Sequence, residues 1–178
     1  MVVIHANDPT TSFLSQLYEQ REDISVHIKE SDTKSAVQRA IRQDDVIMML
    51  GHGTKYGLLS APDKRGEYPR FLIDSDFVQF LRAKTCIGIW CHADEFADTY
   101  KLHGLFSGMI ISELHEAIEY EVVATKEEID FEMVKFASRL RKCIDQYKLE
   151  EVPMRMRELD DVKSALTTFN YNNLFYFE

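Results

Sequence analysis

The sequence contains few cysteines, which could form disulfides, and few glycines and prolines, which interrupt regular secondary structure. It has three cysteines, seven glycines and four prolines in 178 residues. A low and odd cysteine count argues against a disulfide framework and favours a reducing compartment. The scarcity of glycine and proline argues against a disordered chain. We therefore expect an ordered fold with free thiols.

Long apolar runs and an excess of positive charge are missing as well. No stretch approaches the ~20 apolar residues that a membrane helix needs. The N-terminus has neither the basic region nor the apolar length of a signal peptide. Lysine and arginine number 21 against 30 aspartates and glutamates, a net charge of −9, which argues against binding to nucleic-acid phosphates. We expect a cytoplasmic protein without a membrane or nucleic-acid partner.

What the sequence does have is the composition of an ordinary globular protein. Hydrophobic residues make up 45% and charged residues 29% of the chain. This length predicts a single domain over residues 1–178, large enough to bury a core without metal ions or disulfides. We expect a core over residues 1–112 and a helical C-terminal part over residues 113–178.

Apolar runs and helically spaced apolar residues alternate along the first two thirds of the chain. The runs predict strands over residues 2–5, 24–28, 46–50 and 85–91, and a fifth over residues 108–112. A turn-rich stretch after the third strand predicts a hairpin excursion. Residues 174–177 predict an edge strand or a segment packed on the core. Because parallel strands need crossover connections, this order predicts an α/β fold, a three-layer αβα sandwich around a mostly parallel sheet.

The residues that follow the strands are the candidates for chemistry, because such sheets form their sites at the carboxyl ends of the strands. His52 follows the third strand between Gly51 and Gly53, and Cys91 ends the fourth. A cysteine nucleophile needs a base or a positive neighbour, and imidazole titrates near neutrality. The ends of neighbouring strands lie about 5 Å apart. His52 and Cys91 are therefore a candidate base and nucleophile, and the N–H groups of Gly53 and Cys91 are candidate oxyanion donors.

A purely structural explanation of these residues stays open. A cysteine at the end of a strand is often a small buried hydrophobe, and a Gly-His-Gly segment is often a turn. We assign Cys86 and Cys143 to the core on that ground.

Residues 45–53, Asp-Val-Ile-Met-Met-Leu-Gly-His-Gly, resemble the His-Gly strand of caspase-like cysteine peptidases, a group that includes caspases, gingipains and CHAT domains. In that group a variable excursion and a helix follow His-Gly, and the next strand ends in the nucleophilic cysteine. The resemblance covers about residues 1–112. It implies a caspase-like fold with flavodoxin-like sheet topology. It also implies His52 as general base, Cys91 as nucleophile, a backbone contribution of Gly53 to the oxyanion hole, and no cofactor.

A peptidase of this kind would act on a peptide or protein substrate. The candidate edge residues are acidic, which predicts a pocket for a basic side chain; they are Asp8, Asp94, Glu95 and Glu113. Solvated loop carboxylates are the alternative explanation of the same residues.

Other functions stay open. The dipeptide Cys91-His92 resembles the nucleophile turn of class I glutamine amidotransferase-like hydrolases, which would make His92 the base. A catalytically inactive caspase-like signalling or interaction module is a further alternative, and a homo-oligomer is compatible with the sequence. The chain has no Cys-x-x-Cys pair and no His-Glu-x-x-His segment, so we expect no metal site.

Overall fold

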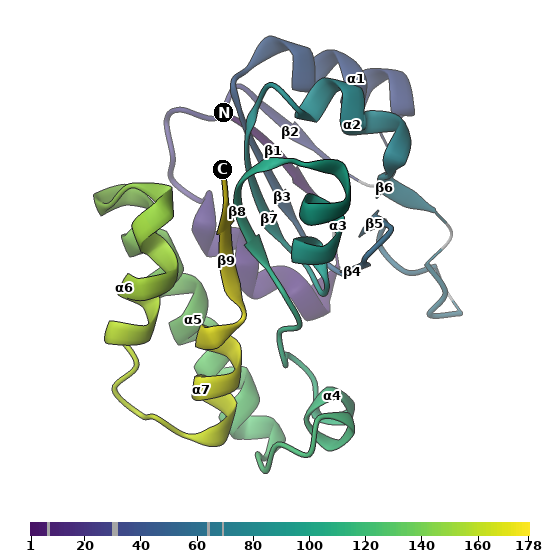
Figure 1. The fold of residues 1–178 in the computed structure, drawn as a ribbon. Coiled ribbons are helices and arrows are strands. Elements are labelled where there is room, and N and C mark those ends of the chain that lie inside the picture. The colour runs from purple at the N-terminus through teal and green to yellow at the C-terminus, as the bar shows by residue number, and fades with distance from the viewer. Residues whose placement is uncertain (7, 30–31, 64, 69) are drawn as a thin grey trace.

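A computed structural model describes residues 1–6, 8–29, 32–63, 65–68 and 70–178 (Figure 1). The strands are β1 (Val2–His5), β2 (Val26–Ile28), β3 (Val46–Leu50), β4 (Gly53–Thr54), β5 (Gly57–Leu59), β6 (Phe71–Ile73), β7 (Thr85–Ile89), β8 (His103–Ser107) and β9 (Leu174–Phe177). The α-helices are α1 (Lys34–Gln43), α2 (Val78–Leu81), α3 (Ala93–Tyr100), α4 (Leu114–Glu119), α5 (Lys126–Gln146), α6 (Val152–Glu158) and α7 (Ala165–Asn172). Three 3₁₀ helices are η1 (Pro9–Leu17), η2 (Ser75–Phe77) and η3 (Leu149–Glu151).

The centre of the fold is a sheet of six strands in the order β2-β1-β3-β7-β8-β9. Every neighbouring pair is parallel except β8 and β9, which are antiparallel. Helices α1, α2 and α3 lie on one face, and η1 with α5, α6 and α7 lies on the other (Figure 1). The predicted α/β class with a mostly parallel sheet is confirmed, and the layers are compatible with a three-layer sandwich.

Alternation along the strands divides the interior into two cores. Side chains of a strand point to opposite faces in turn. Met48 and Leu50 of β3 pack under η1 and α5, whereas Ile47 and Met49 pack under the helices of the other face. All four are fully buried, which explains why β3 is a continuous apolar run rather than an alternating one.

The fifth parallel strand does not lie where the sequence predicts it. It spans His103–Ser107, and residues 108–112 form no strand. Its register with β7 fixes this earlier position, in which Gly104 lies opposite Cys86. Only glycine fits there, because a Cβ at position 104 would lie 1.9 Å from the Cys86 carbonyl oxygen. In the run 108–112, Ile110 and Ile111 are buried, and the side chain of Asn170 in α7 binds the backbone of Ile111.

The segment between β3 and β7 is the predicted hairpin excursion. Strands β4, β5 and β6 form a separate antiparallel sheet, and η2 and α2 then lead into β7. Of the two alternatives predicted for residues 174–177, the structure has the edge strand, as β9 at the edge of the main sheet. The C-terminal part therefore contributes both helices and a sheet strand to the fold.

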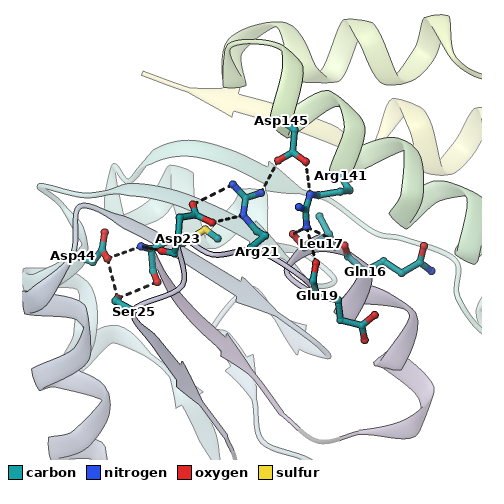
Figure 2. A network of polar contacts seen from close by, with 10 residues as sticks. Gln16, Leu17, Glu19, Arg21, Asp23, Ser25, Asp44, Arg141 and Asp145 are labelled. Carbon is teal, nitrogen blue, oxygen red and sulfur yellow. Dashed lines mark hydrogen bonds and ion pairs between the residues drawn. The ribbon is translucent and has the colours of Figure 1, made fainter.

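Polar contacts tie η1 to the long helix α5 (Figure 2). The guanidinium of Arg141 donates to the carbonyl oxygen of Leu17 over 2.9 Å and also pairs with Asp145. Arg21, just beyond η1, bridges Asp145 at 2.7 Å and Asp23 at 2.8 Å. These contacts hold η1, which begins beside the candidate site, against α5.

Within the described ranges, no helix is long and apolar enough to cross a bilayer.

Candidate active site

His52 and Cys91 follow neighbouring strands at the same edge of the sheet. Strands β3 and β7 pair in parallel with Leu50 opposite Ile89, and each candidate residue comes two positions after one of these. The N–H of Gly51 donates to the carbonyl oxygen of Ile89 over 3.1 Å, so the pairing continues to the start of the site. The two side chains line the same two hollows.

The larger hollow is an open cleft of about 390 Å³, within the range of small-ligand sites. It is lined by His52, Gly53, Leu59, Tyr68, Cys91, His92, Met109, Glu113, His115, Glu116, Glu119 and Tyr120. The smaller hollow is mostly apolar and lies beneath η1 and α5. It is lined by Thr11, Phe13, Leu14, Gly51, His52, Ile89, Trp90, Cys91, Ile110, Ser112 and Phe136.

Three residues surround the imidazole of His52. Its Nε2 lies 2.7 Å from the Thr10 hydroxyl and 3.5 Å from Oδ2 of Asp8. The ring of Tyr68 meets it edge-on, with 5.5 Å between ring centroids. Asp8 is buried at the N-terminal cap of η1, where its Oδ1 accepts from the N–H of Thr10. The segment that follows β1 therefore supplies Asp8 and Thr10, and the excursion between β5 and β6 supplies Tyr68.

Cys91 carries a partly buried thiol. Burial raises its pKa from the ordinary value of 9.0 to about 12, and the negative charges of Glu116 and Glu113 contribute in the same direction. Its Sγ donates to the carbonyl oxygen of Ile110 over 3.8 Å. The next residue, His92, has a left-handed backbone (φ 67°) and caps α3. Cys91 thus sits at a tight strand-to-helix turn, and it is protonated at neutral pH.

The loop over residues 108–113 is held by α7. The Asn170 side chain accepts from the N–H of Ile111 over 2.8 Å and donates to its carbonyl oxygen over 3.0 Å, both bonds buried. The N–H of Gly108 donates to the carbonyl oxygen of Asn173 over 3.0 Å. This loop carries Ile110, the acceptor of the Cys91 thiol. Sequence reasoning missed Asn170, whose only signal is a polar residue on the apolar face of a helix.

Gly53 has a packing role that the sequence did not indicate. A Cβ at this position would lie 2.0 Å from Cδ1 of Trp90 and 2.7 Å from the carbonyl oxygen of Gly57. The Trp90 indole is buried and donates to the carbonyl oxygen of Thr54 over 3.1 Å. Gly53 also lines the cleft beside His52. Its role in an oxyanion hole stays a prediction.

The four predicted pocket carboxylates lie in different places. Glu113 lines the cleft, whereas Asp8 is buried against His52. Asp94 and Glu95 are in the first turn of α3, and neither lines the cleft in the described part of the chain. Burial raises the pKa of Asp94. Glu95 lies 2.9 Å from Nδ1 of His92, so the alternative base already has a carboxylate partner.

Two further carboxylates line the cleft that the sequence analysis did not predict, those of Glu116 and Glu119. Glu116 is buried, and its Oε2 accepts from the N–H groups of Ser112 and Glu113 over 2.7 and 2.9 Å. Together with Glu113 it forms the capping box that begins α4. The sequence signal for this helix start was only half of a capping box, because Glu116 occupies its third position whereas Glu113 replaces the usual Ser or Thr at the cap.

Among the residues that the structure describes, no group of three or more His, Cys, Asp or Glu side chains is arranged to hold a metal ion. No family model matches the chain, and no curated protein matches it.

Proposed function

We propose that this chain is a caspase-like cysteine peptidase in which Cys91 is the nucleophile and His52 the general base. The observation that carries the proposal is the shared cleft, which His52 and Cys91 line from the ends of neighbouring parallel strands. The order of elements supports it too, since the excursion β4–β6 and helix α2 separate the two residues along the chain. That is the order the resemblance to caspase-like peptidases implies.

The proposed reaction begins from a protonated thiol. As Cys91 Sγ bonds to the substrate carbonyl carbon, its proton passes to His52 and the carbonyl oxygen becomes an oxyanion. The imidazolium then protonates the leaving amine as the peptide C–N bond breaks, leaving a thioester. Water, deprotonated by His52, hydrolyses the thioester and returns the proton to Cys91. Asp8 stabilises the transient positive charge on His52, because its Oδ2 lies 3.5 Å from Nε2.

The substrate class follows from the charge of the cleft. Glu113, Glu116 and Glu119 line it, and no described lining residue is Lys or Arg. In a partly buried cleft such charges attract an opposite charge and repel a like one. We therefore propose that the side chain preceding the cleaved bond is Lys or Arg rather than Asp.

Cleavage of a fluorogenic peptide panel tests this proposal. We expect turnover after Arg or Lys, none after Asp, and a loss of at least ~10³-fold in kcat/KM for Cys91→Ala and for His52→Ala. Cys143→Ala serves as the matched cysteine control, because Cys143 is buried in α5 and lines neither hollow. Glu119→Gln should weaken the preference for basic side chains, whereas Glu22→Gln, which changes net charge equally on an exposed loop, should not. Cleavage after Asp would refute the assigned specificity.

One observation favours a second candidate, an inactive interaction module. The pKa of Cys91 is raised by burial and by acidic neighbours, whereas reactive cysteines usually have thiolates stabilised by positive surroundings. Labelling with a peptide chloromethyl ketone carrying Arg separates the two functions. The peptidase requires modification of Cys91 that His52→Ala abolishes and His92→Ala preserves. Dependence on His92 instead would indicate the amidotransferase-like arrangement, and no labelling at Cys91 would favour the module.

A further inference from the structure

The contacts behind His52 determine which of its two ring nitrogens carries the proton in the neutral state. Oδ1 of Asp8 accepts two hydrogen bonds from Thr10, one from its N–H over 3.0 Å and one from its hydroxyl over 2.9 Å. A hydroxyl has a single proton to donate. Once the Thr10 proton points to Asp8, only the lone pairs of that oxygen remain for other partners.

The same oxygen lies 2.7 Å from Nε2 of His52. If the Thr10 proton pointed to Nε2 instead, the lone pairs of Oγ1 would face the acceptor Oδ1 of Asp8 at 2.9 Å, which is unfavourable. With that proton on the bond to Asp8, Nε2 is the donor in the bond to Thr10. Neutral imidazole carries one N–H, so Nδ1 is then left with a free lone pair. From these contacts we infer that Asp8 and Thr10 are positioning residues, which hold His52 as the Nε2–H tautomer and leave Nδ1 as the base. As a step of catalysis, this inference rests on the proposed function.

The second oxygen of Asp8 points to the same role. Oδ2 is buried and has no hydrogen-bond partner among the described residues, and the Asp8 side chain is only 4% exposed. A buried oxygen without a partner is costly. Its position 3.5 Å from Nε2 places it where a proton gained by the imidazole would create positive charge. The unsatisfied oxygen is thus explained by the charged form of His52.

The surrounding fold keeps this arrangement rigid. Asp8 caps η1, and its own N–H donates to the carbonyl oxygen of Ala6 over 2.9 Å. At the other end of η1, Arg141 holds the carbonyl oxygen of Leu17 (Figure 2). A helix fixed at both ends presents the Thr10 hydroxyl to His52 in one orientation, which is what selection of a single tautomer requires.

Long-range ¹H–¹⁵N correlation spectra of the imidazole rings test the inference directly. At alkaline pH, where free imidazole is neutral, the ¹⁵N shifts of His52 should show a protonated Nε2 and an unprotonated Nδ1. The signals are assigned by their loss in His52→Gln. Thr10→Val removes the hydroxyl at nearly constant shape and should shift the ring toward a mixture of tautomers. Thr10→Ser should restore the Nε2–H form, and Thr168→Val, an exposed threonine of α7, should leave it unchanged.

Asp8→Asn gives a second, independent variant. Its amide can still accept from Thr10 at the Oδ1 position, but it places an N–H group where Oδ2 faced Nε2. A donor at that point favours an unprotonated Nε2, so the Nδ1–H form should increase. In peptide cleavage, Thr10→Val and Asp8→Asn should lower kcat at least ~10-fold with KM nearly unchanged, because general acid–base catalysis contributes about 10²–10⁴-fold.

The spectra and the kinetics separate two failures. An Nδ1–H ring in the unmodified protein, or an Nε2–H ring that persists in both Thr10→Val and Asp8→Asn, would overturn the inference. An Nε2–H ring that responds to both variants, in a protein that cleaves no peptide, would support the tautomer assignment and refute the proposed peptidase.

Discussion

Replacement of Asn170 by alanine should destabilise the protein through the loop that holds Cys91. The side chain makes two buried hydrogen bonds to the backbone of Ile111, at 2.8 and 3.0 Å. Truncation leaves one N–H and one carbonyl oxygen buried without partners. At about 1–3 kcal/mol for each orphaned group, the free energy of unfolding should fall by about 2–6 kcal/mol. That is a large part of the ~5–15 kcal/mol typical of a domain.

Urea denaturation followed by tryptophan fluorescence measures this loss cleanly. Trp90 is the single tryptophan of the chain and is 2% exposed, so its emission reports unfolding of the region beside the cleft. At a urea dependence of about 2 kcal/mol per M, in the middle of the ~1–3 kcal/mol per M found for small proteins, the unfolding midpoint should fall by about 1–3 M. Thr168→Ala, at an exposed position of the same helix, should change stability by less than about 0.5 kcal/mol.

The same variant tests whether the two hydrogen bonds from Asn170 to Ile111 also restrict the Cys91 thiol. The carbonyl oxygen of Ile110, the residue before Ile111, accepts the hydrogen bond of the Cys91 thiol. Under native conditions Asn170→Ala should therefore increase the rate at which iodoacetamide alkylates Cys91, whereas alkylation of Cys143 should not change. A loss of stability below about 1 kcal/mol would refute the energetic argument. Unchanged alkylation in a folded variant would refute the connection from α7 to the thiol.

Three further predictions concern packing and pH. Gly53→Ala places a Cβ 2.0 Å from the buried Trp90 ring and should cost about 1–3 kcal/mol by overpacking; an unchanged urea midpoint would contradict it. Burial raises the pKa of Cys91 from 9.0 to about 12, so its contribution to stability is complete below pH 9 and is lost as the pH rises toward 12; Cys91→Ala should decline less steeply over that range. Burial lowers the pKa of His5 from 6.5 to about 4, so the stability of its neutral form is complete above pH 6.5 and is lost as the pH falls through 4; His5→Gln should flatten the acid limb of a stability–pH curve.

Local pattern was enough to predict the fold class, because strand and helix periodicities are properties of short segments. Neighbouring residues in the sequence account for three of the elements. They are the continuous apolar run of β3, the capping box that begins α5 at Thr125, and the edge strand β9. The fifth strand was misplaced for the same reason. Residues 108–112 are as apolar as a strand, and only pairing of Gly104 with Cys86 of β7 decides that β8 lies earlier.

The sequence by itself determined that a histidine and a cysteine follow two strands of a mostly parallel sheet, since strand ends can be read from local hydrophobic pattern. Only the tertiary structure decided that these strands are neighbours and that both side chains line one cleft. It also decided the roles of Asp8 beside His52 and Asn170 beside Ile111, whose partners are distant along the chain. Hydrogen bonds and burial depend on distances in space, and residues far apart in sequence leave no periodic signal of the contacts that folding gives them.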